Sequence, residues 1–167
     1  SFCGTPEYLS PEVITGEGHN KSCDWWSFGI LIYEMSCGRP PFCHEDLDKM
    51  YEMIRYSDLK FPTKINISPL TKDIISRLVD RNQNTRLGSK GGFNEIKAHA
   101  FFQKMDFESL LSKKMKAPFI PIVQNKFDVQ NFDKEFTTEN PDDKSEIPFK
   151  SMEIIKKNQE KFKEFFN

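Results

Sequence analysis

The sequence lacks several features that would each point to a particular partner or compartment. Its 167 residues carry 24 Lys and Arg against 25 Asp and Glu, so no basic excess favours nucleic acid or an anionic membrane. It has only four cysteines, and their spacing fits neither a metal site nor a dense disulfide framework. It shows no signal peptide and no apolar run long enough to span a bilayer. We therefore expect a cytoplasmic protein, with a nuclear location also open.

The region before Ala117 is expected to be mostly helical. Residues 22–38 have apolar side chains on every side at helical spacing, which predicts a helix that is buried all round and ends at Gly38. No convincing strand is present, so the fold class is mainly α. Further helices are predicted near Glu45–Ser57, from Ser68 as N-cap through Leu78, around Asn94–His99, and from Asp106 through Met115.

The composition changes after Lys116. Residues 117–123 contain two prolines, which predict an extended segment because proline cannot continue a helix. The polar stretch Thr137–Glu146 is expected to be a loop or disordered, and Ser151–Phe166 an amphipathic helix. These changes predict two domains, residues 1–116 and residues 117–167.

Four motifs in order carry a resemblance to a known family. Residues 1–12 resemble the activation segment of a eukaryotic protein kinase, with Ser-Pro-Glu where the family usually has Ala-Pro-Glu. The other three motifs are Asp24–Gly29, Gly38–Phe42 and Arg86–Gly88. Together they are similar to the AGC group of serine/threonine kinases. Within this group, Phe2–Glu12 and Phe132–Thr137 look most like protein kinase B and its serum-and-glucocorticoid-regulated relatives, with protein kinase A close behind. The resemblance implies the C-terminal-lobe half of the kinase fold, followed by an extended AGC tail.

The resemblance also implies an activity and its partners. In kinases, the glycine-rich loop, the phosphate-pairing lysine, the catalytic aspartate and the magnesium-binding aspartate precede the activation segment, and none of these motifs occurs in this sequence. We expect the C-terminal part of a basophilic serine/threonine kinase that uses ATP and Mg²⁺, with neither bound by this chain alone and no activity from it alone. Expected partners are protein substrates with basic residues before the phosphoacceptor, an upstream activating kinase and the N-terminal half. The alternative is a pseudokinase or a truncated, non-catalytic binding module.

Five residues of the first segment resemble kinase site residues. Ser1 aligns with the activation-loop phosphoacceptor, unless it is only the position where the sequence begins. Thr5 resembles the threonine whose hydroxyl bonds the catalytic aspartate and a lysine, or it is a turn residue before Pro6. Phe2, Pro6 and Leu9 resemble the wall of the pocket for the substrate residue after the phosphoacceptor; ordinary packing is the alternative.

Glu34 is a candidate that the sequence itself singles out. It lies in the apolar helix, where an unpaired carboxylate is costly, so it must reach a cation or open onto a cleft. By resemblance it binds a substrate arginine, and an internal Arg or Lys partner is the alternative. Asp24 resembles the aspartate that bonds the catalytic loop, although it also suits a helix N-terminus. Glu12 and Arg86 resemble the family's buried ion pair.

Aromatic residues of the second domain resemble contacts of the AGC tail. Pro118–Pro121 resembles the segment that straps across the lobes, and Phe132 the aromatic that reaches the adenine pocket. Phe162 and Phe165 resemble the hydrophobic motif that docks on the small lobe, with one locally packed helix face as the alternative. No Thr-Pro turn motif follows Thr137 and no Ser or Thr follows Phe165, so phosphorylation of that motif is not expected.

Overall fold

The computed structural model describes residues 4–139, 151 and 153–158. None of these residues lies in a β-strand, which confirms the mainly helical fold. No helix among them combines the length and the apolar character needed to cross a membrane. Up to residue 139 the helices are η1 (Pro6–Tyr8), α1 (Pro11–Thr15), α2 (Ser22–Cys37), α3 (Leu47–Tyr56), α4 (Pro69–Leu78), α5 (Phe93–Lys97), η2 (Ala100–Phe102), α6 (Phe107–Leu111) and α7 (Lys134–Thr137).

The chain divides into two units, of which one ends at Ser112 and the other begins at Lys113. Helix α6 ends at Leu111 because Lys113 adopts a φ of 57°, a left-handed conformation that cannot continue a right-handed helix. The predicted extension of this helix to Met115 is therefore wrong. The predicted domain boundary between residues 116 and 117 stays a prediction.

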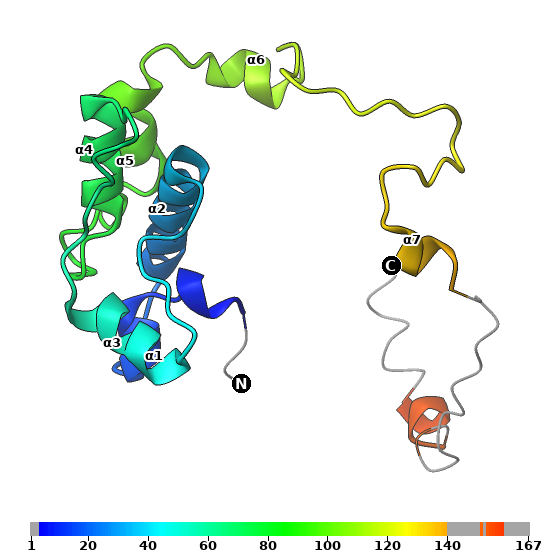
Figure 1. The fold of residues 1–167 in the computed structure, drawn as a ribbon, viewed down its shortest axis with the longest axis horizontal. Coiled ribbons are helices and arrows are strands. Elements are labelled where there is room, and N and C mark those ends of the chain that lie inside the picture. The colour runs from blue at the N-terminus through cyan, green and yellow to red at the C-terminus, as the bar shows by residue number, and fades with distance from the viewer. Residues whose placement is uncertain (1–3, 140–150, 152, 159–167) are drawn as a thin grey trace. The chain divides into compact units, whose positions relative to one another are not determined.

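Helix α2 is the centre of the first unit and packs against η1 and α4 (Figure 1). The close contact with α4 depends on Gly29. A Cβ at this position would lie 2.7 Å from Cβ of Leu78 and 2.8 Å from Cγ2 of Val79. Any side chain would therefore force the two helices apart.

The prediction that α2 is buried on all sides is wrong for the described residues. Trp26 and Ile30 are fully buried, but Leu31 is 40% exposed and Met35 is 69% exposed. The periodicity showed that every face of this helix is apolar. It could not show which face the described elements η1 and α4 cover.

The core around α2 combines residues from α3, α4 and the connecting segments. Trp26 stacks on Phe42 with the ring centroids 6.2 Å apart, so the turn after α2 folds back onto the helix. Helix α1 packs against α3, as Figure 1 shows. The buried cluster comprises Trp26, Ile30, Ile32, Tyr33, Phe42, Met50, Ile54, Ile74, Ile75, Leu78, Val79, Leu87 and Ile96.

Side-chain caps fix several helix starts. Ser68 Oγ accepts a hydrogen bond from the Thr71 backbone N–H at 3.1 Å, which confirms the predicted N-cap of α4. Asp46 caps α3 in the same way, so this helix begins at Leu47 rather than at Glu45. The helix predicted around Asn94–His99 is observed as α5, Phe93–Lys97.

The second unit has little regular structure in its described residues. Residues 117–123 contain no helix, as their prolines predict. Thr137 belongs to α7 rather than to a loop, because the Asp133 side chain caps that helix. Residues 151 and 153–158 are helical. Residues 140–146 of the predicted loop, and residues 152 and 159–166 of the predicted amphipathic helix, lie outside the described residues.

Candidate functional site

The segment from Gly4 to Glu12 is held on helix α2 by side-chain hydrogen bonds at Tyr8. The Tyr8 hydroxyl donates to Oε2 of Glu34, and Ser27 Oγ donates to the Tyr8 carbonyl oxygen at 2.8 Å. The hydrogen bond to Glu34, together with burial, raises the pKa of Tyr8 above its usual value of 10.0. Helix η1 is therefore fixed to α2 through both the backbone and the side chain of one residue.

Glu34 has a different partner from the one expected. It is half-buried on α2, and no Lys or Arg of the described residues forms an ion pair with it. Its described partner is the uncharged phenol of Tyr8. A carboxylate has lone pairs for about four hydrogen bonds, so this phenol leaves acceptor sites free for a cation.

Glu12 and Arg86 form a buried, bidentate ion pair. Arg86 Nη1 lies 2.6 Å from Oε1 of Glu12, and Nη2 lies 2.9 Å from Oε2. The Arg86 side chain is fully buried and that of Glu12 is 6% exposed. Burial alone would raise the pKa of Glu12, but the hydrogen bonds and the charge of Arg86, together with hydrogen bonds from the backbone and Ser10, outweigh it and hold the pKa below the usual 4.5. The pair joins α1 to the loop after α4.

Two further acceptors and an aromatic ring complete the surroundings of Arg86. Its Nη1 donates to the Ser22 carbonyl oxygen and its Nε to the Asp80 carbonyl oxygen, both at 2.8 Å. Its guanidinium carbon lies 5.3 Å from the centroid of the Trp26 ring. The guanidinium therefore connects the start of α1, the start of α2 and the loop that begins at Asp80.

The Trp25 indole packs closely against the same loop at Gly88. A Cβ at Gly88 would lie 2.7 Å from Cδ1 of Trp25, and Gly88 has a φ of +90°. Only glycine meets both requirements without strain. This contact explains why glycine follows Arg86-Leu87 at this position.

The other candidates of the first unit lie at its surface. Thr5 is exposed, and its side chain makes no capping bond, although its carbonyl oxygen accepts the Tyr8 backbone N–H at 3.1 Å. Asp24 is exposed in the first turn of α2, with the Cys23 thiol 3.8 Å from its carboxylate. Pro6 and Leu9 are half-buried on either side of Tyr8 in sequence. Ser1 and Phe2 lie outside the described residues.

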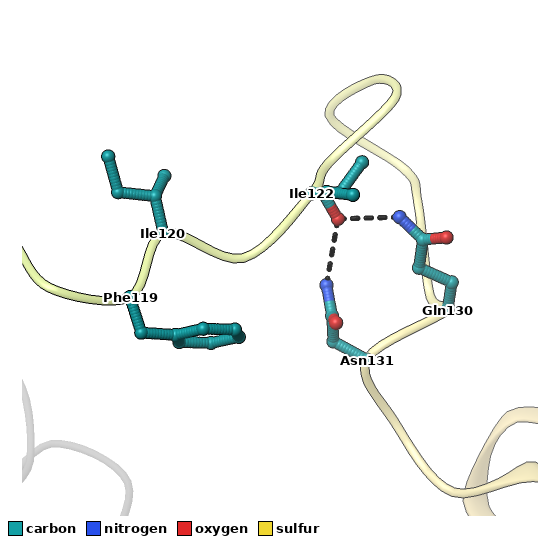
Figure 2. Close-up of a pocket in the computed structure, with 5 residues that line it drawn as sticks. All are labelled: Phe119, Ile120, Ile122, Gln130 and Asn131. Atoms are coloured by element: carbon teal, nitrogen blue, oxygen red, sulfur yellow. Dashed lines mark hydrogen bonds between the residues drawn. The ribbon is translucent and has the colours of Figure 1, made fainter.

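In the second unit, a loop over residues 122–132 borders a pocket of about 330 Å³ (Figure 2). Figure 2 shows Phe119 and Ile120 on one arm of the chain and the amides of Gln130 and Asn131 on the other. Both amides donate to the Ile122 carbonyl oxygen, at 2.5 Å from Gln130 and 3.1 Å from Asn131. The loop is thus closed on itself by side chains.

The structure locates one of the three candidate phenylalanines of the tail. Phe132 is the last residue of this closed loop, and its side chain is 67% exposed. Phe162 and Phe165 lie outside the described residues. Among the described residues, no group of three or more His, Cys, Asp and Glu could hold a metal ion.

Sequence reasoning missed two residues that shape the site. Tyr8 was not singled out, because nothing in a sequence identifies a hydrogen-bond partner 26 residues away. Arg81 donates through Nε to the Ile54 carbonyl oxygen at 2.9 Å and through Nη2 to that of Ser57, so it caps the end of α3. No local pattern around Arg81 signals this role.

Comparisons with known proteins agree with the motifs. The model of the protein kinase domain matches residues 1–102, and that of the protein kinase C terminal domain matches residues 123–165. The serine/threonine-protein kinase gad8 of Schizosaccharomyces pombe is 48% identical over 143 residues, 86% of this chain and 25% of gad8. The kinase YPK2/YKR2 of Saccharomyces cerevisiae is 42% identical over 93% of this chain and 23% of its own length.

A further relative is the serine/threonine-protein kinase sgk-1 of Caenorhabditis elegans, which is 41% identical over 89% of this chain and 32% of its own length. The chain thus spans between about a quarter and a third of these curated relatives. The kinase-domain match covers more than half of the chain, and the tail match follows it in order. The chain therefore belongs to the protein kinase family, within the AGC group of serine/threonine kinases.

Proposed function

We propose that this chain supplies the substrate platform, the activation-loop site and the regulatory tail of a basophilic serine/threonine kinase. The complete enzyme transfers the γ-phosphate of ATP to serine or threonine of proteins that carry basic residues before the phosphoacceptor. ATP and Mg²⁺ are bound by kinase motifs that these 167 residues do not include, so the groups that carry out phosphoryl transfer belong to the other part of the enzyme.

The observation that carries the substrate preference is the state of Glu34. This carboxylate is half-buried, it is hydrogen-bonded by an uncharged phenol, and no Lys or Arg of the described residues pairs with it. A guanidinium that reached it would form a charge-assisted hydrogen bond, which is about twice as strong as a neutral one. Tyr8 would hold the carboxylate in place for that bond.

The exposed residues Thr5 and Asp24 fit contacts with the catalytic loop. The Thr5 hydroxyl makes no capping bond and can both donate and accept, as bridging an aspartate and a lysine requires. The Asp24 carboxylate lies at the surface of the α2 N-terminus, where it can accept backbone N–H groups. Glu12 and Arg86 hold the segment that carries Thr5, so their role is architectural.

The remaining candidates belong to substrate binding, regulation and the tail. Phe2, Pro6 and Leu9 form the pocket for the substrate residue after the phosphoacceptor. Ser1 is the site at which an upstream kinase adds phosphate, and that charge orders the activation loop through arginine. In the tail, Phe132 contacts the nucleotide pocket, while Phe162 and Phe165 form the hydrophobic motif.

The test compares Glu34→Gln with the unchanged intact kinase on two peptides that differ only in an arginine before the phosphoacceptor. We expect Glu34→Gln to lower kcat/KM for the arginine peptide by about 10- to 100-fold, the value of one charge-assisted bond, and to leave the other peptide nearly unchanged. Glu17→Gln, which removes an exposed carboxylate after α1, is the matched control. Equal losses on both peptides would refute the arginine role.

The same assay separates the enzyme from a non-catalytic relative. The alternative function is a pseudokinase or a truncated module that binds partners through the same face. Suppose that the intact protein, supplied with ATP and Mg²⁺, transfers no phosphate to any serine or threonine peptide. That result would support the alternative and refute the proposed reaction.

A further inference from the structure

The loop over residues 122–132 is closed by a set of hydrogen bonds that we name the Asp128 clasp. The Asp128 carboxylate accepts the backbone N–H of Gln124 at 2.7 Å and that of Gln130 at 3.0 Å. It also accepts the side-chain amide of Gln130 at 2.9 Å. One side chain thus ties the outgoing and returning arms of the loop together.

The carbonyl oxygen of Ile122 completes the Asp128 clasp. It accepts the side-chain amides of both Gln130 and Asn131, so the two arms are tied at a second point (Figure 2). The bonds from the Gln124 and Gln130 backbone also lower the pKa of Asp128 below its usual 3.8, so the carboxylate is the form that closes the loop.

Phe132 lies between this clasp and a capped helix. Its backbone N–H donates to the Val129 carbonyl oxygen at 2.9 Å, which makes Gln130 and Asn131 the central residues of a turn. Both central residues are bound to the Ile122 carbonyl oxygen. On the other side, Asp133 caps helix α7 through the Glu135 backbone N–H at 3.0 Å. The backbone of Phe132 is therefore fixed on both sides, while its ring stays 67% exposed.

We propose that Asp128 is a positioning residue for Phe132, because its clasp sets the direction of the aromatic ring before nucleotide binds. This inference rests on the proposed contact of Phe132 with the nucleotide pocket. A ring that already has its bound direction loses less conformational entropy on binding, so a preformed turn increases affinity without any added contact. Asp128 would then act on ATP binding without touching ATP.

The experiment measures KM for ATP and kcat in the intact kinase at a saturating peptide concentration. The variants are Asp128→Ala, Asp128→Asn and Phe132→Ala, with Lys126→Ala as the matched control. Lys126 lies in the same loop, and its described contact is with the ring of Phe127, 4.9 Å away. We expect Asp128→Ala to raise KM for ATP roughly three- to tenfold, the value of one or two hydrogen bonds, with kcat nearly unchanged.

Asp128→Asn gives a graded result because an asparagine keeps one acceptor oxygen and loses the other. We expect its KM for ATP to lie between the KM of the Lys126→Ala control and the KM of Asp128→Ala. Hydrogen exchange at the Gln124 and Gln130 amides reports the clasp directly and should be faster in Asp128→Ala. In a Phe132→Ala background, Asp128→Ala should have no further effect on KM, since there is no ring left to position.

The outcomes separate this inference from the proposed function. If Phe132→Ala raises KM for ATP while Asp128→Ala behaves like Lys126→Ala, the positioning role is refuted and the nucleotide contact stands. If Phe132→Ala leaves KM unchanged, the nucleotide contact is refuted, and the positioning role falls with it. A rise in KM from Asp128→Ala that persists undiminished in the Phe132→Ala background also overturns the inference.

Discussion

Breaking the buried ion pair of Glu12 and Arg86 should strongly destabilise the first unit. Glu12→Gln keeps the shape of the side chain but removes its charge and turns one acceptor into a donor. The guanidinium of Arg86, which is fully buried, then keeps an uncompensated charge, and its Nη2 loses the acceptor 2.9 Å away. Breaking one partner of such a pair costs about 3–5 kcal/mol, and we expect about 3 kcal/mol for this conservative change. The total free energy of unfolding of a domain is only about 5–15 kcal/mol, so this loss is a large part of it.

Urea unfolding of the 167-residue chain, followed by circular dichroism at neutral pH, measures the free energy of unfolding that Glu12→Gln removes. The double variant Glu12→Leu with Arg86→Met removes both charges and should recover much of the loss, because apolar side chains can fill a buried ion-pair site. A loss below about 1 kcal/mol in Glu12→Gln would refute the reasoning, since exposed pairs have that value. Failure of the double variant to recover would show that the backbone acceptors of Arg86 matter more than the carboxylate.

The pair also predicts a pH dependence with a defined sign. The pKa of Glu12 is lower in the folded state than its usual 4.5, so the unfolded chain binds the proton more readily. The contribution of Glu12 is therefore complete above pH 4.5 and is lost as the pH falls through the lower folded-state pKa. Other carboxylates with a lowered pKa titrate in the same pH range. The measurement is therefore the difference in unfolding free energy between the unchanged chain and Glu12→Gln. That difference should shrink below pH 4.5, and a constant difference would contradict the assignment.

Three further predictions test individual contacts. Gly29→Ala should destabilise the chain by about 1–3 kcal/mol in urea unfolding because its Cβ would meet Leu78 at 2.7 Å, and any stabilisation would contradict the close helix contact. Arg81→Ala should cost about 1–3 kcal/mol by removing the cap of α3, with faster hydrogen exchange confined to the last turn of that helix; unchanged exchange there would rule out the cap. The pKa of Tyr8, followed by NMR of labelled tyrosine, should lie above 10.0 and move towards that value in Glu34→Gln, and an unchanged pKa would show that Glu34 is not its cause.

Features that depend on neighbours in sequence were predicted well. Ser68 and Pro69 start α4 where expected, because a cap and a first-turn proline act within one helical turn. The prolines of residues 117–123 exclude a helix for the same local reason. The short helices α1 and α7 were not predicted, although α5 and α6, each also five residues long, were.

Features that depend on tertiary contacts were predicted less well. Local reasoning showed that the carboxylate of Glu34 needs a partner, but it assumed a cation or a cleft, and the structure gives it the phenol of Tyr8. The pairing of Glu12 with Arg86, 74 residues apart, came from family resemblance, because no local rule joins two such distant residues. The exposed face of α2 at Leu31 and Met35 was missed for a related reason. An apolar pattern shows that a helix face can be buried, but it does not show whether another element covers that face.

Three long-range hydrogen-bonded contacts fix the segment from Gly4 to Glu12, and each ends on a different part of the first unit. Tyr8 is bound to the last turn of α2 through Glu34 and nearer the start of that helix through Ser27, while Glu12 is bound to the loop after α4 through Arg86. The conformation of the segment therefore depends on the packing of α2 on α4 as well as on the segment's own turns. It follows that a core change such as Gly29→Ala, which alters that packing, should weaken the proposed arginine selectivity of Glu34 in the intact kinase even though Gly29 contacts neither residue of the Tyr8–Glu34 pair. If selectivity stayed at its original value while stability fell, the segment would have to be held by contacts of its own.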